Sequence, residues 1–230
     1  MIHFLKIATL SLLVSTTGLA ATAKGIPGAY LNMFFGPFVH KSDSVGGTDF
    51  SNFLGVNAGV NYGKDKQVAF SFHNDRMSTD FRQSESSISS DFTQFSMGYR
   101  FLWFHPSIIA GHGTMEASSD DPDVGEVFDV VFTNFGFGLD VEIPYTAVIN
   151  TYVKIHSLDT TKVVDADGND INFGTRTEVD AGVTIALPFP ILMVNTGYLH
   201  RSFSVEVEEG GLKQQIQTGP YLGFTLGHSF

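Results

Sequence analysis

Apolar and polar residues alternate with a period of two along almost the whole chain. The stretch 215–230 shows this most plainly: its even positions are mostly apolar, from Ile216 to Phe230, and its odd positions are small or polar, from Gln217 to Ser229. Residues that alternate in this way lie on opposite faces of a β-strand. The chain is therefore expected to be all-β, with one face of each strand in an apolar environment.

Ten stretches carry this pattern, and clusters of Gly, Pro, Asp, Asn and Ser that are typical of turns separate them. Short connections follow every second strand, whereas the other connections are longer and polar, as in transmembrane barrels with short periplasmic turns and longer extracellular loops. We predict a single closed antiparallel up-and-down transmembrane β-barrel, most simply of ten strands, with eight or twelve as alternatives. The predicted strands are 29–40, 50–62, 67–81, 91–104, 108–117, 127–143, 146–158, 175–187, 191–205 and 215–230.

Residues 1–23 have the composition of a cleaved secretory signal peptide. Lys6 supplies a positive charge, 7–14 is apolar, and the Ala-Thr-Ala motif at 21–23 fits a cleavage site. The barrel would then occupy 24–230 and keep 12 basic and 24 acidic residues, because Lys6 is the one charged residue removed. This negative balance excludes nucleic acid as the expected partner. The absence of Cys excludes a lipid attachment site and a disulfide framework.

The polar faces of the strands distinguish a membrane barrel from a soluble barrel with an apolar interior. A basic side chain that faces lipid at the bilayer midplane costs about 2–4 kcal/mol, so the charged faces are expected to point into the lumen. We predict that Arg100 and Lys154 pair there with acidic residues and leave a plugged or very narrow lumen. The predicted charge network comprises Arg100, Lys154, Asp140, Glu142, Glu178 and Asp180.

Aromatic residues gather close to the predicted short turns. Tyr and Trp are enriched where a barrel wall crosses the membrane–water interface, because their rings are amphipathic. We therefore predict a periplasmic aromatic girdle made of Tyr62, Tyr99, Trp103, Tyr145 and Phe189.

The last strand, which ends on Phe230, resembles the closing strand of Gram-negative outer-membrane β-barrels. The resemblance covers the architecture of the chain and points to no single member of that superfamily. It implies location in the outer membrane, export through the inner membrane, and lipid and lipopolysaccharide as surroundings. It also implies that the barrel assembly machinery reads a C-terminal signal formed by Tyr221, Phe224, Leu226 and Phe230.

The expected function is a structural or surface-interaction role through the extracellular loops, and a narrow pore for small solutes is the alternative. Acidic loops such as 118–126 offer carboxylates that suit divalent cations. The segment 165–170 superficially resembles a calcium loop, but its Gly falls at the fourth position and it lacks the final Glu, so we interpret it as a turn. No metal ligand and no cofactor are predicted.

No catalytic residue is assigned, although two kinds of outer-membrane enzyme were considered. His200 and Ser202, with Glu206 nearby, resemble the His-x-Ser element of lipid A deacylases, but the flanking residues of that family are absent. An omptin-like protease would place paired acids and an Asp–His pair at the outer rim, but its longer loops are missing. The candidates by position for such a protease are Asp75, Asp80, His156 and Asp159.

Overall fold

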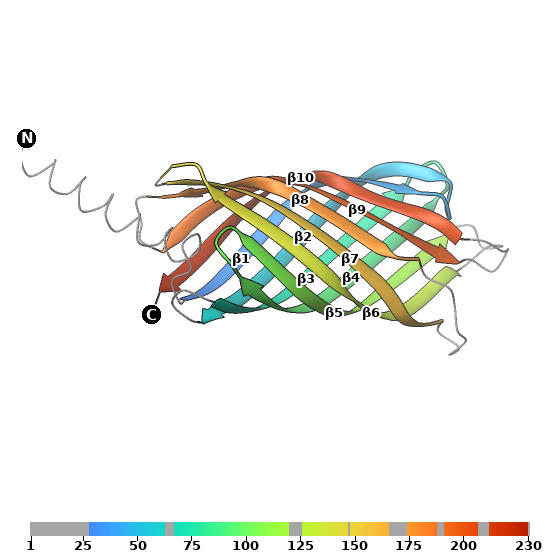
Figure 1. Cartoon of the computed structure of the whole chain (residues 1–230). Helices are drawn as coiled ribbons and strands as arrows, with labels where there is room; N and C mark the ends of the chain where they lie inside the picture. The colour runs from blue at the N-terminus through green and yellow to red at the C-terminus, as the bar shows by residue number, and fades with distance from the viewer. Residues whose placement is uncertain are drawn as a thin grey trace, which may run out of the picture.

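The computed structural model describes residues 28–62, 67–119, 126–146, 148–165, 174–187, 191–206 and 212–229. In this part of the chain ten strands form one closed antiparallel barrel, in which each strand pairs with its neighbours in sequence and β1 pairs with β10 (Figure 1). The predicted ten-stranded barrel is confirmed. The strands are β1 (Gly28–Ser42), β2 (Gly47–Tyr62), β3 (Gln67–Phe81), β4 (Ser86–Arg100), β5 (Phe104–Ser119), β6 (Glu126–Pro144), β7 (Ile149–Asp165), β8 (Arg176–Ala186), β9 (Leu192–Glu206) and β10 (Leu212–Ser229).

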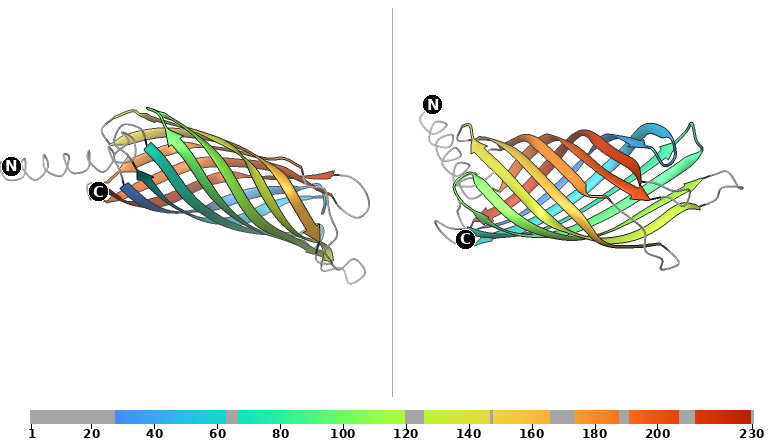
Figure 2. Two further views of the ribbon diagram at one scale, coloured as in Figure 1. Left: turned by 60° about the horizontal axis from the view of Figure 1, so that its bottom comes forward. Right: turned by 45° about the vertical axis from the view of Figure 1, so that its right-hand side comes forward.

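The strands are tilted and staggered around the barrel (Figure 2). One circuit of directly paired residues starts at Ala29 of β1 and returns to β1 at Lys41, twelve residues farther along. From one strand to the next in sequence, a directly paired residue therefore lies about one residue farther along the barrel axis, toward the end opposite the termini. Such a stagger is the geometric condition for closing a tilted sheet. The circuit runs through Ala29, Val60, Phe70, Met97, Ile108, Phe137, Ser157, Thr177, Ser202, Ile216 and Lys41.

Two connections that were expected to be long are short. β1 and β2 are joined by 43–46, and β3 and β4 by 82–85, because the strands continue through residues that resemble loop residues in the sequence. The Ser-rich start of β4 is an example: Ser87 and Ser89 face outward on either side of the buried Ile88. The turn between β4 and β5 lies at 101–103 and not at the predicted 105–107.

The side chains on β3 change polarity halfway along the strand without changing their alternation. The outward residues Val68 and Phe70 are apolar, whereas Arg76, farther along the same face, is charged. On the inner face the order is reversed, from Asp75 to Met77. This change of polarity is not caused by a bulge, because β3 pairs continuously with both neighbours through Asn74. Register shifts occur instead at Ala117/Ser118 and Thr133/Asn134.

The same inversion divides the whole barrel into two zones. The zone nearer the termini, here called the belt, carries exposed apolar side chains on its outer face. Apolar area of this extent on a closed barrel is the surface that lipid covers. No helix among the described residues is long and apolar enough to span a membrane. Members of the belt include Leu31, Met33, Phe35, Val60, Phe70, Phe95, Met97, Ile108, Phe137, Leu139, Ile155, Val179, Ile185, Leu222, Phe224 and Leu226.

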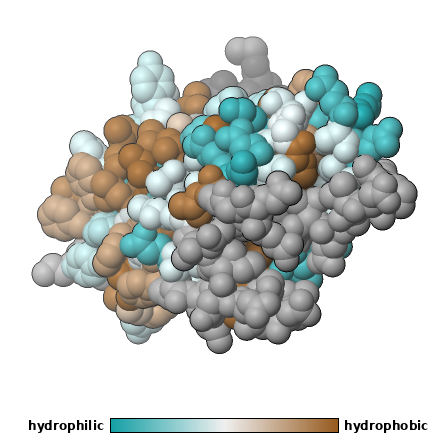
Figure 3. All heavy atoms as spheres, turned by 90° about the vertical axis from the view of Figure 1, so that its right-hand side faces the viewer, coloured by the Kyte–Doolittle hydropathy of each residue, from teal (hydrophilic) through white to brown (hydrophobic). Residues whose placement is uncertain are grey.

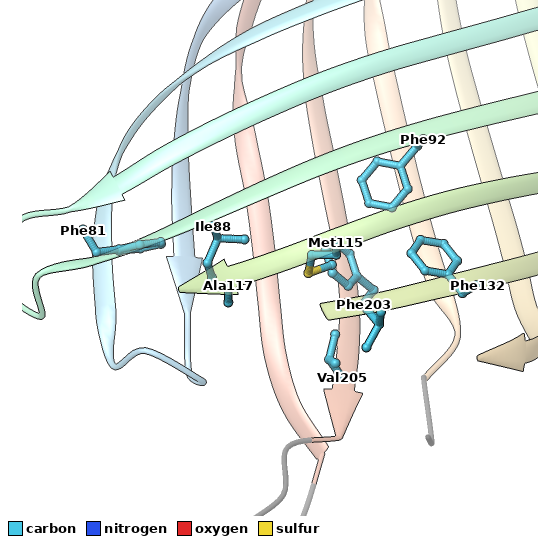
Figure 4. Close-up of a cluster of buried hydrophobic side chains, with 9 residues drawn as sticks. Phe81, Ile88, Phe92, Met115, Ala117, Phe132, Phe203 and Val205 are labelled. Carbon is cyan, nitrogen blue, oxygen red and sulfur yellow. The ribbon is translucent and has the colours of Figure 1, made fainter. Parts of the chain in front are cut away.

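The second zone, here called the collar, forms the opposite end of the barrel. Strands of up to 19 residues are longer than the roughly 9–11 residues that a tilted strand needs to cross the hydrocarbon. On the outer face of β3–β5 and β7–β9 the collar carries hydroxyl and charged groups. Inside it, an apolar cluster (Figure 4) packs beside a buried polar group formed by His40, Thr79 and Gln215. The cluster inside comprises Phe81, Ile88, Phe92, Met115, Ala117, Val130, Phe132, Phe203 and Val205.

Glycines inside the barrel make room for large side chains on the neighbouring strand. Gly55 pairs with Phe34, whose ring occupies the space that a Cβ atom of residue 55 would fill. Gly182 faces Tyr152 in the same way. Alternating small and large inward residues fill a narrow barrel without clashes.

Replacing Gly55 by Leu should therefore destabilise the barrel by about 1–3 kcal/mol, because the new side chain must displace the ring of Phe34 from a filled lumen. Urea-induced unfolding of the protein refolded in lipid vesicles measures the change. Ala58→Leu, three residues along β2 and on the outer face, is the matched control and should be close to neutral. Equal destabilisation by both substitutions would contradict this account of the glycine.

Candidate functional site: the barrel lumen

The lumen at the level of the belt contains a polar cavity of about 190 Å³. All six residues of the predicted charge network lie on its wall. The wall also carries polar atoms with no protein partner, including Gln94 Nε2 and Asn57 Oδ1. Unpartnered buried polar groups around a space of this size are normally satisfied by ordered water. This half of the lumen is therefore a hydrated chamber.

The two predicted cations are each joined to an acid on the wall of the chamber. The Arg100 guanidinium donates a hydrogen bond to Glu142 Oε2. Lys154 Nζ lies 3.6 Å from Asp180 Oδ2 and 5.1 Å from the centre of the Tyr152 ring. The same Asp180 accepts a hydrogen bond of 2.7 Å from the hydroxyl of Tyr221. Alternation on each strand turns these groups inward, and the register then sets which of them meet.

A second group of charges crosses the lumen above the chamber, and we call it the septum. It consists of Asp75, Arg176, Glu178 and Arg201. Arg201 binds Asp75 through two nitrogens, with Nη1–Oδ1 and Nη2–Oδ2 distances of 2.8 and 2.6 Å. Its Nε donates to Glu178 Oε1 at 2.6 Å. Because β9 and β3 are not neighbours in the barrel, this bidentate pair ties opposite walls together.

The rest of the septum is held by the same carboxylate and by an aromatic ring. Arg176 also donates to Glu178, and both guanidinium groups lie over the ring of Phe92, at 3.9 and 4.7 Å from its centre. The four charged side chains are 8% exposed or less. A buried charge is tolerated only when it is paired and hydrogen-bonded, so the septum must remain assembled.

Histidines connect the septum to its surroundings. His156 Nε2 lies 3.1 Å from Asp140 Oδ1, and its Nδ1 lies 3.7 Å from Glu178 Oε2. His73 Nε2 lies 2.7 Å from Asp75 Oδ2. His156 therefore links Asp140 of the chamber to Glu178 of the septum.

The apolar cluster inside the collar lies beyond the septum and completes the closure of the described lumen (Figure 4). The expected lumen was polar throughout; the structure differs, because the wall of the collar faces water and its interior must supply the hydrophobic core. Rings of β4, β6 and β9 meet there: the centres of Phe92 and Phe132 are 5.5 Å apart, and those of Phe92 and Phe203 are 5.9 Å apart.

Of the four septum residues, only Glu178 belongs to the charge network predicted from the sequence. Asp75 was a candidate for a protease site, Arg201 was the middle residue of the His-x-Ser element, and Arg176 carried no prediction. Alternation alone would have turned Asp75, Glu178 and Arg201 inward. Only the closure of the barrel and its stagger bring β9 opposite β3, so their pairing has no local signal in the sequence.

The residues considered for catalysis do not assemble into a site. His200 and Ser202 lie on the outer face of β9, where Ser202 Oγ accepts a hydrogen bond of 3.3 Å from Gln214 Nε2. Asp75 and His156 lie in the lumen, whereas Asp80 and Asp159 face outward. The side chain of Glu206 lies outside the described part.

No group of three acidic or His side chains within the described ranges has the arrangement of a metal site. The residues 120–125 of the acidic loop and 166–170 of the calcium-like segment lie outside these ranges.

The other predicted residues lie in two different environments. Tyr62, Tyr99, Trp103 and Tyr145 are exposed near the short-turn end, and Phe189 lies outside the described residues. In β10, Phe224 and Leu226 face outward, whereas Tyr221 points into the lumen and bonds Tyr152. Phe230 lies outside the described range. The girdle and the assembly signal remain predictions.

Removing one partner from the septum should be strongly destabilising. Arg201→Met leaves Asp75 and part of Glu178 uncompensated in a buried position, and we expect a loss of about 3–5 kcal/mol in urea unfolding. Arg76→Met is the matched control, because Arg76 bonds Asp91 at 2.9 Å on the exposed face, where such pairs contribute about 0–1 kcal/mol.

A double variant tests whether the two septum residues act together. Asp75→Asn combined with Arg201→Met should cost clearly less than the sum of the two single substitutions. Additive effects would show that the pair is not coupled, contrary to the structure.

Comparisons with known proteins were made for both the sequence and the fold. The sequence matches no protein-family profile and no curated protein. Similar solved structures include Neisserial surface protein A, with 12% identity, 86% of this chain and 96% of that chain covered, and a TM-score of 0.44. The translocator domain of the autotransporter NalP from Neisseria meningitidis has 13% identity, coverage of 90% and 92%, and a TM-score of 0.45. The outer membrane protein OprG from Pseudomonas aeruginosa has 8% identity, coverage of 90% and 99%, and a TM-score of 0.36.

No activity follows for this chain at such identities. The closed ladder, the apolar belt and the charged lumen identify the chain on physical grounds as a ten-stranded antiparallel transmembrane β-barrel.

Proposed function

We propose that the protein is an integral outer-membrane barrel whose lumen is closed and whose role is structural or surface-interacting, exercised at the collar end. The single observation that carries the proposal is the double closure of the lumen. The Arg201–Asp75 pair crosses it, and the apolar cluster fills it beyond that point. A solute would have to separate a buried ion pair and then pass through packed rings.

The collar is the part of the barrel suited to meet other molecules. Its sheet continues beyond the belt, and the short connections 43–46 and 82–85 join its strands there. Hydroxyl and carboxylate groups such as Ser89, Asp91 and Glu116 line its outer face. These groups suit the polar part of lipopolysaccharide, and the carboxylates suit divalent cations that would bridge to its phosphates. No enzymatic role is proposed.

A signal peptide at 1–23 and recognition of β10 by the barrel assembly machinery belong to the same proposal. The support for recognition is the outward position of Phe224 and Leu226 on the last strand, where an external factor could contact them.

A narrow pore for small solutes is the second candidate. The observation in its favour is the polar chamber of about 190 Å³, which provides a route for solutes through the part of the lumen at the level of the belt. Passage through the rest of the lumen would require the septum and the collar cluster to move apart. The chamber by itself is a vestibule that ends at Arg201.

Single-channel recording in planar bilayers decides between the two candidates. We expect the refolded protein to shift its gel mobility on heating, as folded barrels do, and to give no steady conductance. The variant Phe92→Ala/Phe132→Ala/Phe203→Ala with Arg201→Ser removes the collar rings and the septum pair and should produce reproducible openings if it keeps the heat-dependent shift.

Steady unitary conductance of the unmodified protein would overturn the closed-lumen proposal and establish the pore. A milder variant, Arg201→Ser with Asp75→Ser, serves if the larger one does not fold. It should remain silent, because the collar cluster still fills the lumen.

A further inference from the structure

The outer edge of the apolar belt is not level around the barrel. On β3 the outward residue Phe72 is followed by Asn74 and then by Arg76. On β4 and β5 polar residues begin at the same paired level, at Thr93 and His112. The flank formed by β10, β1 and β2 departs from this pattern, since apolar outward residues recur on it farther toward the collar end, with only the uncharged Asn52 and Thr218 between them and the belt.

Three outward side chains, which we call the flank patch, make up this extension: Val39, Phe50 and Ile216. Val39 pairs directly with Phe50, and Ile216 pairs with Lys41, the next outward residue of β1. Phe50 is 75% exposed. The first cation on the outer face of this flank is Lys41, which stands beyond Val39.

Because of the stagger, the flank patch lies farther toward the collar end than the first charged or polar outward residues of β3 and β9. Arg76 on β3 pairs with Leu54, and Phe50 lies four residues farther outward on β2 than Leu54. One step from β2 to β3 climbs only about one residue, so Phe50 stands about three residues beyond the charged Arg76. By the same geometry Ile216 stands beyond its partner Ser202 on β9.

We propose that the flank patch is a docking surface for the acyl chains of outer-leaflet lipid, so that the hydrocarbon reaches higher on this side of the barrel than on the β3–β5 side. The occupant follows from continuity along β1, where Phe35 and Pro37 of the outer face lead directly to Val39, while the uncharged Asn52 and Thr218 lie on either side of this route. An exposed aromatic in water would bury no area, whereas contact with a chain removes it from water.

Seen from the collar end, hydrophobic and hydrophilic side chains gather on different parts of the circumference (Figure 3). A bilayer meets such an uneven edge either by tilting the barrel or by thickening locally. The barrel would therefore present a defined flank to lipid, with β1 at its centre.

The proposal is tested with single-tryptophan variants in vesicles of phosphatidylcholine brominated on its acyl chains. Trp103→Phe removes the native tryptophan and is the background for Phe50→Trp and for Thr114→Trp. Thr114 is exposed at nearly the same height on β5, three strands away from β2 on the side where the collar is polar. We expect bromine to reduce the emission of Phe50→Trp at least twofold, with a blue shift, and to leave Thr114→Trp nearly unchanged.

Phe70→Trp, in the middle of the belt, is the positive control, because a tryptophan there must contact the acyl chains if the belt faces lipid. Quenching of Phe70→Trp together with equal, weak quenching of Phe50→Trp and Thr114→Trp would overturn the docking surface alone. No quenching of Phe70→Trp would overturn the lipid-facing belt. A blue-shifted Phe50→Trp that escapes bromine, with emission that depends on the protein-to-lipid ratio, would assign the patch to a second copy of the chain and also overturn the proposal.

Discussion

Backbone N–H and C=O groups cannot remain unpaired in hydrocarbon, and the architecture of this protein follows from that constraint. A sheet satisfies them only when it has no free edge, so β1 must pair with β10. Closure requires the tilt and the twelve-residue stagger. The stagger then determines which inward residues face each other, including Gly55 beneath Phe34 and Arg201 opposite Asp75.

One sheet forms both the belt, whose outer face meets lipid, and the collar, whose outer face meets mainly water. In the belt the outer face is apolar because it meets lipid, and the interior collects the charges that lipid excludes. In the collar the outer face meets water over most of its circumference, so apolar side chains move inside and pack as a core. The septum lies between these interiors, where Arg176 and Arg201 bind carboxylates on one side and the face of Phe92 on the other.

This arrangement has consequences for what the protein is able to do. On the proposed function, the chamber would end at a buried ion pair and hold polar groups without conducting them, and the core inside the collar would keep the outer sheet rigid. A rigid rim with hydroxyl and acidic groups suits contact with other molecules better than passage through the barrel. The edge of the belt on the collar side is also uneven, so the rim differs from one side of the barrel to the other. On β2 the exposed Phe50 lies farther toward the collar end than the charged Arg76 of β3.

The alternation of side chains by itself determined the inward direction of Arg100, Asp140, Lys154 and Glu178, because a period of two is a local property of the chain. Together with the turn clusters and the connection lengths, it predicted an antiparallel barrel of ten strands, with eight or twelve as alternatives. Local patterns misplaced the ends of β1 and β4, since serines suit both a loop and a water-facing strand. Which inward charges meet was decided by the tertiary structure alone: Arg201 and Asp75 are 126 residues apart in sequence and come together only because the barrel closes with its particular stagger.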